Sequence, residues 1–139
     1  MSDGNAEHKR RVGRLGEDLA GEFLERKGYR VIARNYRKPW GEIDIIAEKD
    51  GGVRFVEVKA VTREPSGEPA GDGSREMDRI PEELVGRRKL EKLARTAELY
   101  MESMKDKREY QIDVVGVILD MGARKARCRL FEQVLSDDL

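Results

Sequence analysis

The sequence predicts an α/β domain of the mixed α+β kind, with elements in the order α-β-β-β-α-β-β and helices flanking a mixed sheet. Two apolar stripes at helical spacing and five strand-like runs bounded by turn residues lead to this prediction. The 139 residues suffice for one hydrophobic core, so we expect a single domain over residues 1–139.

The first predicted helix covers about residues 9–27 and ends at Gly28, a residue type that favours helix C-termini. Apolar and small side chains recur along it every three or four residues. This stripe consists of Val12, Leu15, Gly16, Leu19, Ala20, Phe23 and Leu24. The residues before it are polar, and we expect residues 1–8 to be frayed.

Three strand-like runs follow, at residues 29–36, 41–48 and 53–61. Pro39-Trp40-Gly41 separates the first two, and Asp50-Gly51-Gly52 is a strong hairpin signal between the second and third. Beside a Pro-Gly turn, Trp40 is more often a cover over the edge of a core than a platform on which a nucleobase stacks.

Residues 63–80 are rich in Gly, Pro, Ser and acidic residues and lack periodicity, so we expect a long, flexible acidic loop. Pro81-Glu82-Glu83 suits the start of a second helix, because proline fits the first helical position and carboxylates favour the positive end of the dipole. Residues 110–121 and 126–135 then predict a hairpin through Gly122. The apolar stripe of the second helix consists of Leu90, Leu93, Ala97, Tyr100, Met101 and Met104.

The composition narrows the class of protein. The chain has 28 basic and 28 acidic residues, yet basic residues predominate at positions 8–39 and 84–96, which permits a local phosphate-binding surface. No run approaches the roughly 18 apolar residues of a membrane span, so we expect no membrane partner. Cys128 is the only cysteine and cannot form an internal disulfide, so we expect a cytoplasmic protein.

Charged residues stand inside two of the apolar strand-like runs: Asp44 in the second, and Glu57 and Lys59 in the third. Buried charges are costly unless they are paired or bind an ion. If Asp50-Gly51 is the turn, Asp44 stands opposite Glu57; if Gly51-Gly52 is the turn, Asp44 stands opposite Lys59. Since side chains alternate with period two, either register puts all three on one face.

Two interpretations of these residues remain open from the pattern alone. The two carboxylates, the backbone carbonyl of Val58 and water would suit Mg²⁺ or Mn²⁺, with Lys59 orienting a hydroxide or neutralising charge on a phosphate. Alternatively, Asp44 and Lys59 form a buried ion pair and Glu57 is half exposed. Judged only as a short string of residues, the ion pair is the commoner outcome.

Asp44, followed by Glu57-Val58-Lys59 on the next strand of a hairpin, resembles the active-site signature of the PD-(D/E)XK nuclease superfamily. The chain is most similar to the bacterial YraN-type family, which resembles archaeal Holliday-junction resolvases. The similarity runs from about Val12 to Val117, although Gln111 stands where an arginine is expected. It rests on Gly13-Arg14-Leu15-Gly16-Glu17, Ala20, Leu24, Gly28-Tyr29, Arg34-Asn35-Tyr36, Gly41-Glu42-Ile43-Asp44-Ile45-Ile46-Ala47, Phe55-Val56-Glu57-Val58-Lys59, Lys89 and Asp113-Val114-Val115.

The resemblance implies a restriction-endonuclease-like core and a set of catalytic residues. These are Glu17, Asp44, Glu57 and Lys59. It also makes Glu17 a third acidic metal ligand beside Asp44, Glu57 and the carbonyl of Val58, whereas the residue pattern alone would leave Glu17 as an ordinary surface acid.

The function expected from this resemblance is metal-dependent hydrolysis of DNA phosphodiester bonds, with branched or junction DNA as a candidate substrate. A resolvase role would favour a twofold homodimer. The alternatives are a nucleic-acid-binding or accessory module without efficient catalysis, and a purely structural domain. The residues expected to hold phosphates are Arg14, Arg34, Arg87, Arg88, Lys89 and Lys92.

Overall fold

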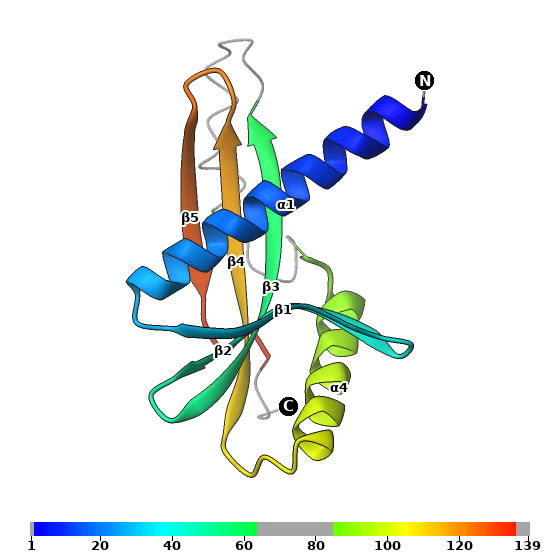
Figure 1. Cartoon of the computed structure of the whole chain (residues 1–139), viewed down its shortest axis with the longest axis vertical. Coiled ribbons are helices and arrows are strands. Elements are labelled where there is room, and N and C mark those ends of the chain that lie inside the picture. Colours follow the sequence, from blue (N-terminus) through cyan, green and yellow to red (C-terminus); the bar gives the residue numbers. More distant parts are fainter. Residues whose placement is uncertain (1, 64–84, 136–139) are drawn as a thin grey trace.

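The structure is a computed structural model, which describes residues 2–63 and 85–135 (Figure 1). Its elements confirm the predicted order and the mixed class of the fold. They are α1 (Ser2–Arg26), β1 (Arg30–Lys38), β2 (Gly41–Lys49), β3 (Gly52–Arg63), α4 (Arg87–Ser103), β4 (Tyr110–Asp120) and β5 (Lys125–Phe131).

The five strands form one sheet in the order β1-β2-β3-β4-β5. Neighbouring strands are antiparallel except β3 and β4, which run parallel. A parallel pair needs a crossover connection, and α4 lies in that connection. The sheet is therefore mixed, as predicted.

The helices cover opposite faces of the sheet, and each face has its own core. The core beneath α4 consists of Ile43, Ile46, Val53, Phe55, Leu90, Leu93, Ala97, Met101, Ile112 and Val114. The core beneath α1 consists of Ala20, Leu24, Tyr29, Ile45, Ala47, Val56, Val115, Val117 and Leu119. Figure 1 shows α1 crossing the sheet and α4 beside the β1–β2 hairpin.

Both helices differ from the sequence prediction at their ends. The helix α1 begins at Ser2 rather than near Lys9, and an ion pair of 3.1 Å between Glu7 and Arg11 joins successive turns of the added segment. The helix α4 begins at Arg87, and the start predicted at residues 81–83 lies outside the described part of the chain. Met104 is exposed at the C-terminus of α4 instead of belonging to its buried stripe.

Within residues 2–63 and 85–135, neither α1 nor α4 is long and apolar enough to cross a membrane.

The turn between β2 and β3 adopts the first of the two predicted registers. Lys49 pairs with Gly52, so Asp50 and Gly51 form a two-residue turn. Both turn residues have positive φ, 52° and 78°, as a type I′ turn requires. The same register places Asp44 level with Glu57 across the hairpin.

A buried carboxylate connects β3 and β4 to the residue just before β1 and to the segment just after β5. Asp113 on β4 is fully buried and accepts hydrogen bonds from the Tyr29 hydroxyl at 3.0 Å, the Gln111 amide at 2.8 Å and the Gln133 backbone N–H at 2.9 Å. The Arg54 guanidinium on β3 lies 3.7 Å from the same carboxylate. Burial and the adjacent Asp113 charge raise the pKa of Tyr29 above its ordinary value. Asp113 therefore acts as a structural acid.

Replacing Asp113 with alanine should destabilise the fold by about 3–5 kcal/mol, since it leaves buried donors without their acceptor and removes the buried one of the two carboxylates beside Arg54. The matched control is Glu132→Ala, which removes an exposed acid 3.5 Å from the same Arg54 and should cost less than ~1 kcal/mol. Urea unfolding of both variants measures the difference. Equal losses would contradict a structural role for Asp113.

Two glycines allow the helices to approach the sheet closely. A Cβ atom at Gly16 on α1 would lie 2.5 Å from the Cβ of Ala60 on β3. A Cβ atom at Gly41 on β2 would lie 2.0 Å from the Oγ1 of Thr96 on α4. A side chain at either position would force the facing residue, Ala60 or Thr96, to shift.

The substitution Gly41→Ala should therefore destabilise the protein by about 1–3 kcal/mol, because the buried Thr96 cannot move into solvent. Gly21→Ala is the control: its added methyl meets no atom within 4 Å, and alanine favours a helix over glycine by roughly 0.5–1 kcal/mol. The free energy of unfolding should fall for the first and rise for the second. Thr96→Ala should recover part of the loss in the double variant.

Candidate active site

The candidate site lies where β2 and β3 stop pairing. Their ladder ends at Ile45 and Val56; closer to its start β2 pairs only with β1, and beyond Val56 β3 pairs with β4. Figure 1 shows the β1–β2 hairpin turning away from the longer strands at this point. The ladder with β2 has already ended at Val58, so the Val58 N–H has no backbone acceptor on β2. It donates instead to the Asp44 Oδ2 at 2.8 Å.

Asp44 stands where β2 changes the face that it presents. Ile43 before it belongs to the core beneath α4, and Ile45 after it belongs to the core beneath α1. The half-buried Asp44 carboxylate consequently lies between the layers, where it interacts with both Glu17 and Glu57. This position explains how one strand acid can meet acids from both faces of the sheet.

Glu57 is the most buried of these acids, with only 4% of its surface exposed. It follows Phe55 by two residues and so faces α4, where the Lys89 ammonium lies 2.7 Å from its Oε1. Burial and then the Asp44 charge raise the pKa of Glu57, against the opposing effect of Lys89. Burial would lower the pKa of Lys89, but the hydrogen bond and charge of Glu57 raise it overall.

Glu17 approaches from α1. It follows Gly16, whose close approach to β3 brings this turn of the helix onto the sheet. Burial and then the Asp44 charge raise the pKa of Glu17, whereas Arg34 at 3.7 Å lowers it. Arg34 also pairs with the exposed Asp18 at 2.8 Å. The helical acid predicted from the family resemblance therefore lies beside Asp44.

The three carboxylates do not form a closed metal cage. Within residues 2–63 and 85–135, no three His, Cys, Asp or Glu side chains are arranged to hold a metal ion. Asp44 interacts with both other acids, while Lys89 and Arg34 neutralise Glu57 and Glu17. The donor chemistry nevertheless fits a hard divalent cation, because carboxylate oxygens are the preferred ligands of Mg²⁺ and Mn²⁺.

The alternative ion pair between Asp44 and Lys59 is wrong. Asp44 accepts from the Val58 N–H, and Glu57 pairs with Lys89. Lys59 is exposed and makes no ion pair with any carboxylate in the described part of the chain. By alternation along β3 it shares the face of Glu57. The Val58 side chain faces α1 near Gly16, and its carbonyl as a metal ligand stays a prediction.

A small cavity of about 260 Å³ opens beside Glu57. Lys89 and Lys92, both predicted to hold phosphates, line it, as does Lys38 at the end of β1, which the sequence analysis missed. The feature of the sequence that could have identified Lys38 was its position directly before the turn at Pro39. The cavity is lined by Lys38, Pro39, Gly41, Glu42, Glu57, Lys89, Lys92 and Leu93.

The other predicted basic residues lie outside this cavity. Arg34 pairs with Glu17 and Asp18, and Arg87 pairs with Glu91 at 3.1 Å on the surface of α4. Arg14 and Arg88 are exposed and do not line the cavity. Only part of the predicted phosphate-binding set therefore gathers near the carboxylates.

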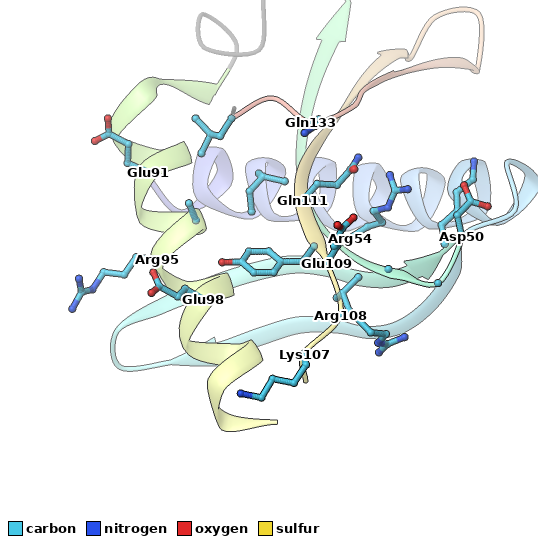
Figure 2. A pocket seen from close by; sticks show the side chains of 18 residues that line it. Asp50, Arg54, Glu91, Arg95, Glu98, Lys107, Arg108, Glu109, Gln111 and Gln133 are labelled. Atoms are coloured by element: carbon cyan, nitrogen blue, oxygen red, sulfur yellow. The ribbon is translucent and has the colours of Figure 1, made fainter. Parts of the chain in front are cut away.

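A larger cavity of about 1080 Å³ lies elsewhere, between α4, the start of β4 and the β2–β3 turn. Glu91, Arg95 and Glu98 of α4 line it on one side in Figure 2, and Arg54 and Gln111 lie on the opposite side. None of the four predicted catalytic residues lines it, whereas Glu57 lines the smaller cavity. Chemistry, not size, therefore selects the smaller cavity as the candidate site.

Comparison with known proteins gives one family. The family described as "Uncharacterised protein family UPF0102" matches residues 16–117. A UPF0102 protein of Dictyoglomus thermophilum is 35% identical over 84% of this chain and 90% of its own length. A UPF0102 protein of Syntrophomonas wolfei subsp. wolfei is 35% identical over 84% and 91%, and one of Campylobacter jejuni is 35% identical over 78% and 85%.

The substitution Asp44→Asn separates the charge of Asp44 from its hydrogen bond. The amide oxygen can still accept from Val58, and the repulsion with Glu17 and Glu57 disappears. We expect the free energy of unfolding in chelator to stay unchanged or to rise by up to about 1 kcal/mol. Asp44→Ala, which leaves the Val58 N–H without its acceptor, should cost about 1–3 kcal/mol. Equal losses in urea unfolding would show that the charge itself stabilises the fold.

Proposed function

The chain belongs to the uncharacterised protein family UPF0102, and we propose that it is a metal-dependent nuclease that hydrolyses DNA phosphodiester bonds. One observation carries this proposal: the meeting of Glu17, Asp44 and Glu57 at the point where β2 and β3 separate. Structural acids are normally satisfied by donors, as Asp113 is. Donors or cations also lie beside these three acids, but burial and then the Asp44 charge raise the pKa values of Glu17 and Glu57, which favours a site that receives a cation.

Asp44 and Glu57 would hold Mg²⁺ or Mn²⁺, with Glu17 and the Val58 carbonyl as further oxygen donors. The ion would supply positive charge and a more acidic water when bound. Asp44 is already oriented for this role by its hydrogen bond with Val58, which fixes its carboxylate on the side of β3. Preorganised ligands need little rearrangement, which supports the assignment.

The lysines supply the remaining chemistry. Lys59 is exposed, shares the face of Glu57 and has no carboxylate partner in the described residues, so its ammonium is available to orient the attacking water. Lys38 and Lys92 lie at the rim of the cavity and would bind the flanking phosphates. Lys89 is 64% exposed and neutralises Glu57 at present, but its length allows it to reach a phosphate instead.

A second function, DNA binding without efficient cleavage, is favoured by one observation. Lys89 and Arg34 already neutralise two of the three acids, so the fold balances these charges without a metal. In that case the lysines would still hold phosphates, and the acids would only shape the groove.

If the protein instead cleaves branched DNA at paired positions, the proposed nuclease function would call for a twofold homodimer.

A cleavage panel tests the nuclease proposal. End-labelled duplex, single-stranded, flapped and four-way DNA are incubated with the protein and Mg²⁺ or Mn²⁺. We expect metal-dependent cleavage that Lys59→Ala lowers by about 100-fold or more, because a group that stabilises the transition state is lost. Glu57→Gln should lower it similarly, whereas Lys125→Ala on β5 should not.

Binding measured on the same DNAs separates the two functions. Lys59→Ala should bind DNA as the unaltered protein does while failing to cleave it. DNA binding without cleavage of any substrate would support the binding module instead. Cleavage that survives both Lys59→Ala and Glu57→Gln would come from a contaminant and would contradict the nuclease proposal.

A further inference from the structure

Trp40 lies at the tip of the β1–β2 hairpin. Lys38 pairs with Gly41, so Pro39 and Trp40 alone form the turn. Trp40 is 47% exposed and belongs to neither hydrophobic core. Trp40 therefore does not pack against either core, in contrast to the sequence-based interpretation of this residue as a cover over the core edge.

The hairpin that carries Trp40 is held firmly against α4. Gly41 packs directly against Thr96, and the ring of Tyr36 meets Tyr100 edge-on with 5.3 Å between the ring centres. Pro39 has a fixed φ angle and so restricts the turn further. The Trp40 ring is consequently presented to solvent from a rigid support, which lowers the entropy lost when it binds a flat partner.

A cavity lined by three lysines opens beside the turn that carries Trp40, although Trp40 itself does not line it. Both of its neighbours in sequence, Pro39 and Gly41, line the cavity that contains Glu57. Three lysines line the same cavity, and Glu42 and Glu57 are its acids. An aromatic ring next to a lysine-lined groove is the combination with which proteins bind single strands: bases stack on the ring, and cations track the backbone. The three lysines are Lys38, Lys89 and Lys92.

We propose that Trp40 stacks on an unpaired nucleobase next to the phosphate that this cavity holds, so that the protein prefers DNA with a single-stranded segment. In a duplex both faces of each base are already covered by neighbouring bases, and Trp40 has no free face to contact. This inference rests on the proposed function for the choice of DNA and for the place of the phosphate. It does not require that the DNA is cleaved.

Trp40 is the only tryptophan of the chain, so tryptophan fluorescence reports on this residue alone. The protein is titrated in chelator, without metal, with oligo(dT), with an abasic strand of equal length and with a duplex. Oligo(dT) should quench the emission and bind more tightly than the other two. The abasic strand keeps every phosphate but has no base, so it should bind weakly and leave the emission unquenched.

Variants complete the test, with affinity measured by anisotropy of labelled strands. Trp40→Ala should weaken oligo(dT) binding by about 5- to 150-fold per stacked base and leave abasic binding unchanged. Trp40→Phe should retain part of the affinity. Met121→Ala removes another exposed apolar side chain, at the β4–β5 turn, and should change neither. Urea unfolding verifies that all variants are folded.

Two results would overturn the stacking proposal: equal affinity for oligo(dT) and the abasic strand, or an equal loss for both strands in Trp40→Ala. Neither result depends on catalysis. If quenching and strand preference are found but no DNA is cleaved, the nuclease proposal fails alone. If cleavage is found and Trp40→Ala binds every strand as before, the stacking proposal fails alone.

Discussion

The hydrogen bond from the Val58 N–H to Asp44 spans the gap at which β2 and β3 stop pairing, and the candidate site depends on it. It satisfies a backbone donor that the ladder no longer reaches, and it fixes the Asp44 carboxylate between the two faces of the sheet. From there Asp44 interacts with Glu17 on α1 and with Glu57, which faces α4.

Asp113 and Glu57 are both buried acids, but their surroundings differ. This difference distinguishes a structural acid from a candidate functional one. Asp113 accepts three hydrogen bonds and faces Arg54, so its charge is fully satisfied and it holds the fold together. Glu57 is nearly as buried, but its charged neighbours are Asp44 and the exposed side chain of Lys89. Its raised pKa reflects a charge that the protein alone satisfies poorly, which is typical of a site that takes up a cation.

The tight packing of the helices supports the site from both sides. Gly16 brings α1 onto β3 next to Glu17, and Gly41 brings α4 onto β2 next to the cavity. The second contact also holds the hairpin that carries Trp40 and Lys38, so the acids, the lysines and the aromatic ring stand on one connected support. Substrate groups could thus be positioned with little motion of the backbone.

The sequence by itself determined the element order and narrowed the β2–β3 hairpin to two registers, both of which bring Asp44 close to Glu57. Those features follow from local chemistry: apolar periodicity, and a turn at Asp50 that requires positive φ. Only the tertiary structure decided that Lys89, not Lys59, pairs with Glu57, that Lys38 lines the cavity and that Trp40 is exposed. These contacts join residues distant in the chain, and they depend on how far the strands diverge and how closely the helices pack, which no local pattern records.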